Sequence, residues 1–215
     1  MLTIPPRLPL LIWGAGGHAK VVADVARASG WEVRGFLDDT PSRTGGVFYG
    51  SPLMGPSSVL FRAEAEQTVA VFVAIGCNAV RARCVIAAQD AGYSVPVLIH
   101  PSAIVSETVE MGAGTIVMAG SVVQADTRMG RGGIINTGAS VDHDGQLGEF
   151  VHVAPGARLT GEVVVGDQTL IGAGAVVIPR CRIGRMCIVG AGAVVVTDVL
   201  DGMTVVGVPA GPHGR

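Results

Sequence analysis

Residues 135–152 read INTGASVDHDGQLGEFVH, which divides into the hexapeptides INTGAS, VDHDGQ and LGEFVH. Each hexapeptide opens with a branched aliphatic residue, and its fifth residue is small or β-branched. The same period continues in both directions without an insertion. All sixteen opening residues are branched aliphatic or Met, a match expected by chance on the order of once in 10⁸. They are Ile99, Val105, Met111, Val117, Val123, Met129, Ile135, Val141, Leu147, Val153, Leu159, Val165, Ile171, Val177, Ile183 and Val189.

A period of six suits neither an α-helix, which repeats every 3.6 residues, nor a flat strand, which repeats every two. It predicts a triangular solenoid in which each hexapeptide forms one short strand and one corner, and three hexapeptides form one coil. The opening residue points into the prism. At about 4.8 Å per coil, slightly more than five coils give a prism about 25 Å tall. A valine-rich sandwich, the alternative, would need turn signals every 8–12 residues.

The chain before residue 99 has a different pattern, in which strand-like and helix-like segments alternate. This predicts a parallel sheet in a small α/β domain of residues 1–98, followed by a β-helix domain and short tail over residues 99–215. Asn78 is the expected N-cap of the second helix. The expected elements are strands at Leu8–Trp13, Val33–Leu37 and Val69–Ile75, helices at His18–Ser29 and Asn78–Ala91, and a loop at Thr40–Ser58.

Residues 14–19 read GAGGHA, between the first expected strand and the first expected helix. They fit the G-x-G-x-x-A fingerprint of Rossmann dinucleotide-binding domains, and Asp38 follows about 20 residues later. Glycine N–H groups at a helix N-terminus bind phosphate, whichever nucleotide carries it. A domain of about 90 residues is too small for a six-stranded dinucleotide fold, so a Rossmann-like mononucleotide site is favoured.

His143 occupies the third, outward-facing position of its hexapeptide, between Asp142 and Asp144. A neighbouring carboxylate favours the protonated imidazole and fixes its tautomer, which suits a general base. A solvated surface histidine is the alternative. Gly161 lies one coil further on, where its N–H could face a reacting carbonyl as an oxyanion donor. His143, the two aspartates and His152 offer no compact ligand set, so no metal is expected.

The composition limits the partners that we expect. The 15 basic and 17 acidic side chains leave a net charge of −2, which argues against nucleic-acid and membrane partners. The apolar run Leu8–Trp13 is too short for a signal peptide or membrane span. Four cysteines without CxxC spacing favour free buried thiols in a reducing cytoplasm. Charged residues make up only 15%, which favours oligomerisation.

An ordered set of short motifs covers nearly the whole chain. It comprises residues 12–20 (IWGAGGHAK), 36–39 (FLDD), 73–78 (VAIGCN), 100–103 (HPSA), 136–144 (NTGASVDHD) and 148–152 (GEFVH). Together these motifs resemble the bacterial sugar O-/N-acyltransferases of the PglD/NeuD type, whose hexapeptide repeats form a left-handed parallel β-helix. The resemblance implies acetyl-CoA-dependent N-acetylation of a UDP- or GDP-linked 4-amino-4,6-dideoxy sugar. It also implies a homotrimer with active sites between subunits.

The resemblance assigns roles to matching positions. His143 is the expected base, and Asp144, where some members have Glu, raises its basicity. Because no Ser or Cys stands beside a base, direct attack on acetyl-CoA is expected rather than a covalent acyl-enzyme. Cys77 stands where relatives often have Asn, which leaves the nucleobase open. The sugar-nucleotide contacts are Gly16, Gly17, His18, Asp38, Asp39, Gly76 and Asn136, and the acetyl-CoA contacts are His152, Ala173 and Ala191.

Three other functions remain open at this point. O-acetylation of a sialic acid-type sugar uses the same chemistry with a hydroxyl nucleophile. An NAD(P)-dependent oxidoreductase would use the loop at Gly14, but it leaves the repeat region unexplained. A non-catalytic scaffold would not need an imidazole between two carboxylates on an outer face.

Overall fold

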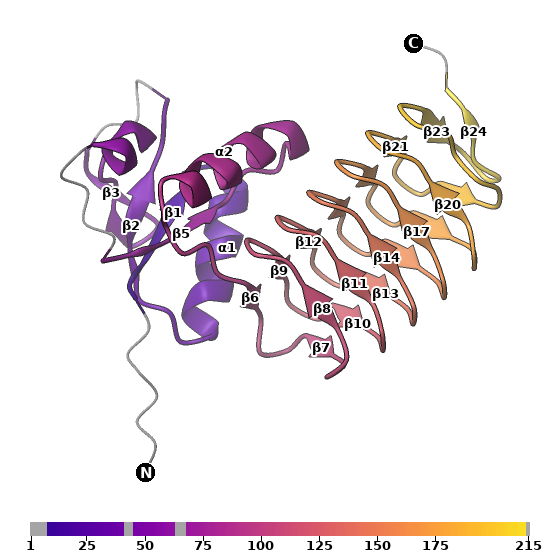
Figure 1. Ribbon diagram of the computed structural model, residues 1–215, viewed down its shortest axis with the longest axis horizontal. Helices are drawn as coiled ribbons and strands as arrows, with labels where there is room; N and C mark the ends of the chain where they lie inside the picture. The colour runs from indigo at the N-terminus through magenta and orange to yellow at the C-terminus, as the bar shows by residue number, and fades with distance from the viewer. Residues whose placement is uncertain (1–7, 41–44, 63–67, 214–215) are drawn as a thin grey trace.

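The computed structural model describes residues 8–40, 45–62 and 68–213. An α/β part lies at one end, and a stack of triangular coils extends from it toward the C-terminus (Figure 1). No helix in these ranges is long and apolar enough to cross a membrane. The predicted order, a small parallel sheet followed by a hexapeptide-repeat β-helix, is confirmed.

The N-terminal sheet is parallel, with strand order β2-β1-β5. Its strands are β1 (Leu10–Trp13), β2 (Val33–Leu37) and β5 (Ala70–Val73), and its helices are α1 (Gly17–Ala28) and α2 (Asn78–Asp90). Every residue of β1 and β5 is buried. Continuous apolar runs of this kind are typical of parallel strands that are covered on both faces.

Two local predictions in this part were wrong. Cys77, not Asn78, is the N-cap of α2, and it makes no side-chain capping bond. The Asn78 amide instead donates to the Gln168 carbonyl of the β-helix at 2.9 Å, a tertiary contact that the local pattern does not encode. Of the four cysteines, all free, Cys77 is exposed and Cys84 partly exposed, so the expectation of buried thiols holds only for Cys181 and Cys187.

The segment expected to be a loop contains a hairpin of β3 (Val47–Phe48) and β4 (Ser51–Pro52), followed by the 3₁₀ helix η1 (Ser57–Phe61). Residues 41–44 of that prediction lie outside the described ranges. The two turn residues, Tyr49 and Gly50, both have positive φ, of 44° and 79°. Positive φ at both central positions matches the twist of a two-residue hairpin. Because Tyr rarely occupies such a turn, the sequence carried little hairpin signal.

The β-helix consists of two-residue strands that pair in parallel with residues eighteen positions away, as Val123 does with Val141. In chain order the strands are β6 (Leu98–Ile99), β7 (Ile104–Val105), β8 (Glu110–Met111), β9 (Ile116–Val117), β10 (Val122–Val123), β11 (Arg128–Met129), β12 (Ile134–Ile135), β13 (Ser140–Val141), β14 (Gln146–Leu147), β15 (His152–Val153), β16 (Arg158–Leu159), β17 (Val164–Val165), β18 (Leu170–Ile171), β19 (Val176–Val177), β20 (Arg182–Ile183), β21 (Ile188–Val189) and β22 (Val194–Val195). Two further strands, β23 (Thr204–Val206) and β24 (Gly211–Pro212), follow at the C-terminal end.

Every third strand belongs to the same sheet. Sheet 1 runs from β6 through β9, β12, β15, β18 and β21, and β23 and β24 extend it. Sheet 2 runs from β7 to β22, and sheet 3 from β8 to β20. The opening residues from Val117 to Val189 form one buried core inside the prism. Ile99, in the first coil, is 38% exposed because no earlier coil covers it.

Each corner of the prism places one residue per coil in the left-handed region of φ. The glycine corner, between sheets 1 and 2, has Gly120, Gly138, Gly156, Gly174 and Gly192 there. The Arg81 corner, between sheets 3 and 1, has Gly114, Gly132, Phe150, Gln168 and Met186 there. The His143 corner, between sheets 2 and 3, has Asp126, Asp144, Glu162 and Arg180 there. Residues other than glycine adopt positive φ at a cost in free energy, and such residues often cluster at functional sites. The charged residues at these positions therefore make the His143 corner a candidate site.

The N-terminal part covers the first coils of sheet 1. Leu98, Ile116 and Ile134 point outward from β6, β9 and β12 and share a buried apolar cluster with α1 and β1. The two parts therefore pack through a common core. This leaves the His143 corner, the vertex opposite sheet 1, on the far side of the prism.

Candidate functional site

A cleft of about 590 Å³ opens where β1, β2 and β5 end. It is lined by Trp13, Gly14, Ala15, Gly16, Gly17, His18, Asp38, Asp39, Thr40, Ala74, Ile75, Gly76 and Val80. Ligands of open α/β sheets bind in this crevice at the carboxyl ends of the strands, with phosphate at a helix N-terminus. The cleft brings together all the N-terminal residues that the sequence predicted as sugar-nucleotide contacts.

The glycines around the cleft differ in what they do. Gly14 has φ +121°, and a Cβ added to it would lie 2.8 Å from the Ala74 carbonyl, so the fold itself excludes a side chain there. At Gly16, Gly17 and Gly76 the backbone is not left-handed, and an added Cβ would meet nothing within 4 Å. Their lack of side chains keeps the cleft open and exposes backbone N–H groups, as a close-fitting ligand requires.

The two aspartates after β2 are tied to the walls of the cleft. Asp38 accepts the N–H groups of Ala15 at 2.9 Å and Thr40 at 2.8 Å. Asp39 accepts the N–H of Ser57 at 2.7 Å. A carboxylate has about four acceptor sites, so both can still accept bonds from a ligand. In this structure the two carboxylates bind the glycine loop at Ala15 and the start of η1 at Ser57.

His18 lies in the cleft with its ring mostly buried. Burial and the positive charge of Arg81 lower its pKa to about 4, so the ring is neutral at pH 7. Among the described residues its buried Nε2 has no hydrogen-bond partner. An unsatisfied buried nitrogen is costly, and a ligand group bound in the cleft could supply the missing bond.

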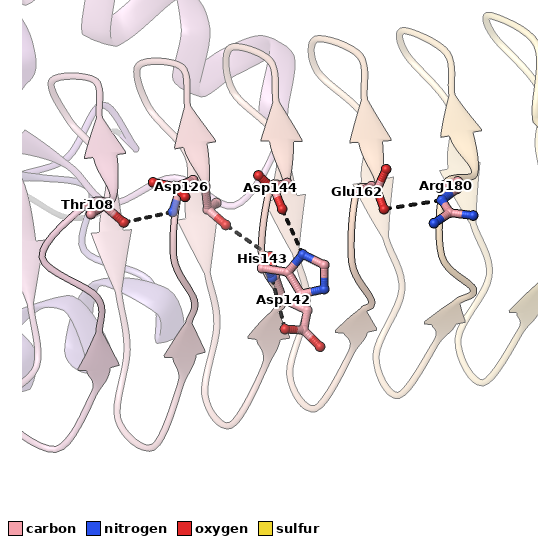
Figure 2. Close-up of polar contacts among 8 residues, drawn as sticks. Thr108, Asp126, Asp142, His143, Asp144, Glu162 and Arg180 are labelled. Carbon is pink, nitrogen blue, oxygen red and sulfur yellow. Dashed lines mark hydrogen bonds and ion pairs between the residues drawn. The ribbon is translucent and has the colours of Figure 1, made fainter.

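His143 lies on the His143 corner with half of its side chain exposed. Its Nδ1 is 2.8 Å from Oδ2 of Asp144, and its backbone N–H donates to Asp142 at 2.9 Å. Figure 2 shows Thr108, Asp126, Asp144, Glu162 and Arg180 in one row along this corner. The hydrogen bond to Asp144 raises the pKa of His143, and the charges of Asp142, Asp144 and Glu162 add to this effect while burial opposes it.

Gly161 lies against the other side of the His143 ring. A Cβ added to Gly161 would lie 2.5 Å from Nε2 of His143, although the Gly161 backbone is not left-handed. Glycine is needed here because the imidazole occupies the space of a side chain. Within the described residues the Gly161 N–H has no hydrogen-bond acceptor, while its carbonyl accepts the N–H of Arg180 at 3.1 Å.

Asn136 and His152 contact each other on sheet 1, with Nδ2 of Asn136 3.1 Å from Nε2 of His152. Oδ1 of Asn136 accepts the N–H of Thr137 at 2.8 Å, which identifies Nδ2 as the donor. Nε2 of His152 therefore accepts, and the ring proton sits on Nδ1. Burial, Arg81 and His18 lower the pKa of His152 to about 4, opposed by a hydrogen bond to the Gly76 backbone.

Ala173 and Ala191 lie side by side on the glycine corner, each directly before a left-handed glycine. The N–H of Gly192 donates to the Ala173 carbonyl at 2.8 Å. Both alanines are exposed. They form part of a narrow exposed edge without large side chains, as an extended chain lying along the backbone would need.

Within one chain the predicted site residues form three groups, one of which is the pair Ala173 and Ala191 on the glycine corner. A second group lies where the cleft meets sheet 1 and contains His18, Gly76 and His152, with Arg81 beside them. Arg81 and His18 lower the pKa of His152, and the Gly76 backbone has hydrogen bonds with both His152 and Arg81. His143, Asp144 and Gly161 lie at the opposite vertex, and the residues lining the cleft all precede position 81. In the described part of the chain no three His, Cys, Asp or Glu side chains are placed to hold a metal ion.

Sequence reasoning missed Arg81, the largest fully buried side chain of the described residues. Its hydrogen-bond acceptors are mainly backbone carbonyls, which leave no mark on a residue pattern. The only available signal was a charged residue at position 81 on the apolar side of the predicted helix.

Comparisons with known proteins agree with this architecture. Residues 9–87 match the PglD N-terminal domain, and residues 162–197 match the bacterial transferase hexapeptide repeats. The acetyltransferase domain of PglB from Neisseria gonorrhoeae is 43% identical, with a TM-score of 0.92, over 96% of this chain and 100% of that one. PerB from Caulobacter crescentus, solved in complex with CoA and GDP-perosamine, is 43% identical, with a TM-score of 0.90, over 96% of this chain and 97% of that one.

A curated relative, the UDP-N-acetylbacillosamine N-acetyltransferase of Bacillus subtilis, is 39% identical over 114 residues. That match spans about half of each chain. The two PglB and PerB structures, by contrast, align over nearly their whole length, and both contain the same pairing of an α/β part with a β-helix. The chain therefore belongs to the PglD-type acyltransferase family, which joins a PglD N-terminal domain to bacterial transferase hexapeptide repeats.

Proposed function

We propose that this protein transfers the acetyl group of acetyl-CoA to the amino group of a UDP- or GDP-linked 4-amino-4,6-dideoxy sugar. The observation that carries the proposal is the geometry at the His143 corner. One ring nitrogen of His143 is held by Asp144 at 2.8 Å, and the other faces a position kept clear by Gly161. The likeness to PerB, which was solved with CoA and GDP-perosamine, supports both substrates.

In this proposal the N-terminal part binds the nucleotide and the β-helix carries out the transfer. Residues 1–98 form the domain that binds the nucleotide of the sugar substrate, through Gly16, Gly17 and Gly76 at its phosphates and Asp38 and Asp39 at its ribose or base. Residues 99–215 form the transfer domain. In it Ala173 and Ala191 contact CoA, His152 lies near the acetyl end, and Asn136 contacts the sugar.

The chemistry follows from the tautomer of His143. Nδ1–H donates to Asp144, so Nε2 carries the lone pair and accepts a proton from the sugar amine as its nitrogen attacks the thioester carbonyl. The Gly161 N–H stabilises the oxyanion of the tetrahedral intermediate. Collapse of the intermediate breaks the C–S bond, and the proton on Nε2 neutralises the departing thiolate. The products are the N-acetylated sugar nucleotide and CoA.

The charges around His143 favour an amine acceptor over a hydroxyl. Asp142, Asp144 and Glu162 surround the ring with negative charge. That field attracts the ammonium form in which a sugar amine arrives, which releases one proton to solvent before its nitrogen attacks, and it gives no such advantage to a neutral hydroxyl. O-acetylation of a sialic acid-type sugar remains the second candidate, because the base and oxyanion donor would serve either nucleophile.

Catalysis between copies of the chain is part of the proposal. The cleft adjoins sheet 1, whereas His143 lies at the opposite vertex, so one copy cannot bring its own base to its own bound sugar nucleotide. A homotrimer would place the His143 corner of one copy against the cleft of the next. Free cysteines are compatible with the cytoplasm, which we propose as the location.

A substrate screen tests this function. The protein is incubated with acetyl-CoA and, separately, GDP-perosamine, UDP-N-acetylbacillosamine and a CMP-linked amino sugar, and the products are analysed by mass spectrometry. A mass increase of one acetyl group on a GDP or UDP sugar, stable to mild alkali as an amide is, supports N-acetylation. An alkali-labile acetyl group would instead indicate O-acetylation.

Ligand-induced thermal shifts distinguish the transferase from the remaining alternative, an NAD(P)-dependent oxidoreductase. Stabilisation by CoA and by GDP or UDP, but not by NAD(H), is expected of the transferase. Stabilisation by NAD(H) without any response to CoA would contradict the proposal and favour an oxidoreductase.

A further inference from the structure

Arg81 lies in the first turn of α2 and is only 1% exposed. Its guanidinium has five N–H donors, and five hydrogen bonds use them. Nε donates to the Gly132 carbonyl at 2.8 Å, Nη2 to the Phe150 carbonyl at 2.9 Å and to Oδ1 of Asn78 at 2.8 Å. Nη1 donates to the carbonyls of Ile75 and Gly76, both at 3.1 Å. The side chain is therefore fully satisfied.

These acceptors belong to two different parts of the molecule. Gly132 and Phe150 are successive left-handed residues of the Arg81 corner, on neighbouring coils of the β-helix. Ile75 and Gly76 form the edge of the nucleotide cleft after β5. One rigid, planar group thus connects the cleft edge to the β-helix, because it donates hydrogen bonds to both.

Asn78 extends the same attachment by one coil. Its Oδ1 accepts from Arg81, and its Nδ2 donates to the carbonyl of Gln168, the next left-handed residue along the Arg81 corner. The start of α2 is therefore held by the carbonyls of Gly132, Phe150 and Gln168, one from each of three successive coils.

The attachment carries a charge that a purely structural contact does not need. None of the five acceptors is a carboxylate, so a cation is buried without an ion-pair partner among them. Apolar side chains of similar size usually stabilise an interface equally well or better. The guanidinium lies near His18 and His152. It donates to the carbonyl of Gly76, whose backbone also has a hydrogen bond with His152. These are groups that face the proposed substrates.

We propose that Arg81 is a positioning residue for acetyl transfer: it sets the place of the cleft edge at Ile75–Gly76 on the β-helix. The proposal rests on the proposed function. If copies of the chain associate through their β-helices, the place of each cleft on its own β-helix decides how far its bound sugar lies from the His143 of a neighbour. A misplacement of about 1 Å between reacting groups lowers rates by about 100-fold.

Arg81→Lys tests this. Lysine keeps the charge, but its single nitrogen donates at most three bonds and cannot span carbonyls on two sides. We expect kcat to fall by about 100-fold, with GDP-perosamine or UDP-N-acetylbacillosamine as the acceptor that the wild type uses. Binding of UDP, GDP and CoA, measured by calorimetry, should change far less than kcat, because most contacts of each ligand do not involve the Ile75–Gly76 edge. Arg83→Lys, on the exposed side of the same helix, is the matched control and should behave as the wild type.

Asn78→Ala keeps the test decisive if Arg81→Lys does not fold. It removes the bond to Gln168 and one acceptor of Arg81, and we expect a fall in kcat of about tenfold with unchanged ligand binding. A folded variant with a lower melting temperature but wild-type kcat would overturn the proposal and leave Arg81 a structural role. Loss of nucleotide binding with unchanged kcat would also overturn it. A wild-type enzyme without activity on any sugar nucleotide would instead refute the proposed function.

Discussion

His143 and His152 lie on one coil of the same repeat, yet the structure gives them opposite environments. His143 occupies a corner, is half exposed, and has a raised pKa because Asp144 accepts its Nδ1 proton. His152 occupies the outward position of β15, is mostly buried by the N-terminal part, and has a pKa lowered to about 4. The first ring is suited to taking a proton, and the second is suited to remaining neutral.

The difference shows how a hexapeptide repeat creates a site. The period alone decides that both rings point away from the core, because neither stands at the opening or the fifth position of its hexapeptide, the two positions that face the core. What separates them is the neighbour on each face: carboxylates and Gly161 beside His143, and Arg81, Asn136 and His18 around His152. A repeat thus supplies outward-facing positions on its corners and strands, and the surroundings make these positions chemically different.

The largest effect is expected when the base is removed. His143→Ala should lower kcat for acetyl transfer by about 10²–10⁴-fold, as loss of a general base does, with little change in thermal stability because the ring is exposed. Product formation followed by mass spectrometry checks this. His213→Ala, which removes another exposed imidazole, should keep full activity. Full activity of His143→Ala would show that His143 is not the base, so the contrast between the two histidines would have no catalytic meaning.

The contact of Gly161 with the His143 ring should be nearly as sensitive. In Gly161→Ala the added methyl group would lie 2.5 Å from Nε2, so the ring must move from its place. We expect kcat to fall by about 100-fold through this misplacement. Steady-state kinetics and a melting curve separate the effect on rate from one on folding. Gly211→Ala, where a Cβ meets nothing within 4 Å, is the control. Wild-type kinetics of Gly161→Ala would show that the ring position is not critical.

Acid should destabilise the fold through the buried histidines. His18 and His152 have folded pKa values of about 4, below the ordinary 6.5, so between these values the unfolded chain binds protons that the folded chain does not. Stability is complete above about pH 6.5 and is lost as the pH falls toward 4. By about pH 5 we expect a loss of about 2 kcal/mol for each ring. Urea unfolding at several pH values measures it.

A variant identifies the source of that acid sensitivity. His152→Gln should flatten the dependence of unfolding free energy on pH by about half, because one of the two rings is gone. The same slope in this variant and in the wild type would show that His152 is not the ring responsible.

The carboxylate beside the base should have the smallest effect of the four. Asp144→Asn removes the negative acceptor that raises the pKa of His143, so the acid limb of the pH–rate profile should move to lower pH. The weaker base should lower the plateau of kcat by about tenfold. Asn tolerates the left-handed φ of this position. Asp126→Asn, at the same place one coil earlier, should leave the profile unchanged. An unshifted acid limb in Asp144→Asn would contradict the role given to this carboxylate.

Sequence reasoning was strongest where the structure repeats. The opening residues from Val117 to Val189 were correctly assigned to the interior, because a period of six can be read without knowing any contact, whereas Ile99 in the first coil is 38% exposed. It was weakest where one segment meets another. The hairpin at Tyr49–Gly50 and the tertiary bond of Asn78 were both missed, because neither has a strong local pattern.

The candidate site likewise contains residues that could be predicted from local motifs and contacts that could not. The glycine loop, the aspartates after β2 and the carboxylates around His143 follow from short motifs, and the structure places each of these groups as local clusters. The joining of the cleft to the β-helix through Arg81 could not be predicted. The acceptors of Arg81 on the β-helix are backbone carbonyls separated by 51 and 69 positions from position 81, and any residue type can supply a carbonyl.

The coil, its interior and the outward placement of His143 can be predicted from the amino-acid sequence, because they depend only on the spacing of side chains along the chain. The tertiary structure decided which outward positions stay exposed and which become buried, and hence why His143 and His152 differ in pKa. It also decided that the cleft and His143 lie on opposite sides of one chain. Burial and electrostatic shifts depend on groups brought together from distant positions, which a linear pattern does not record.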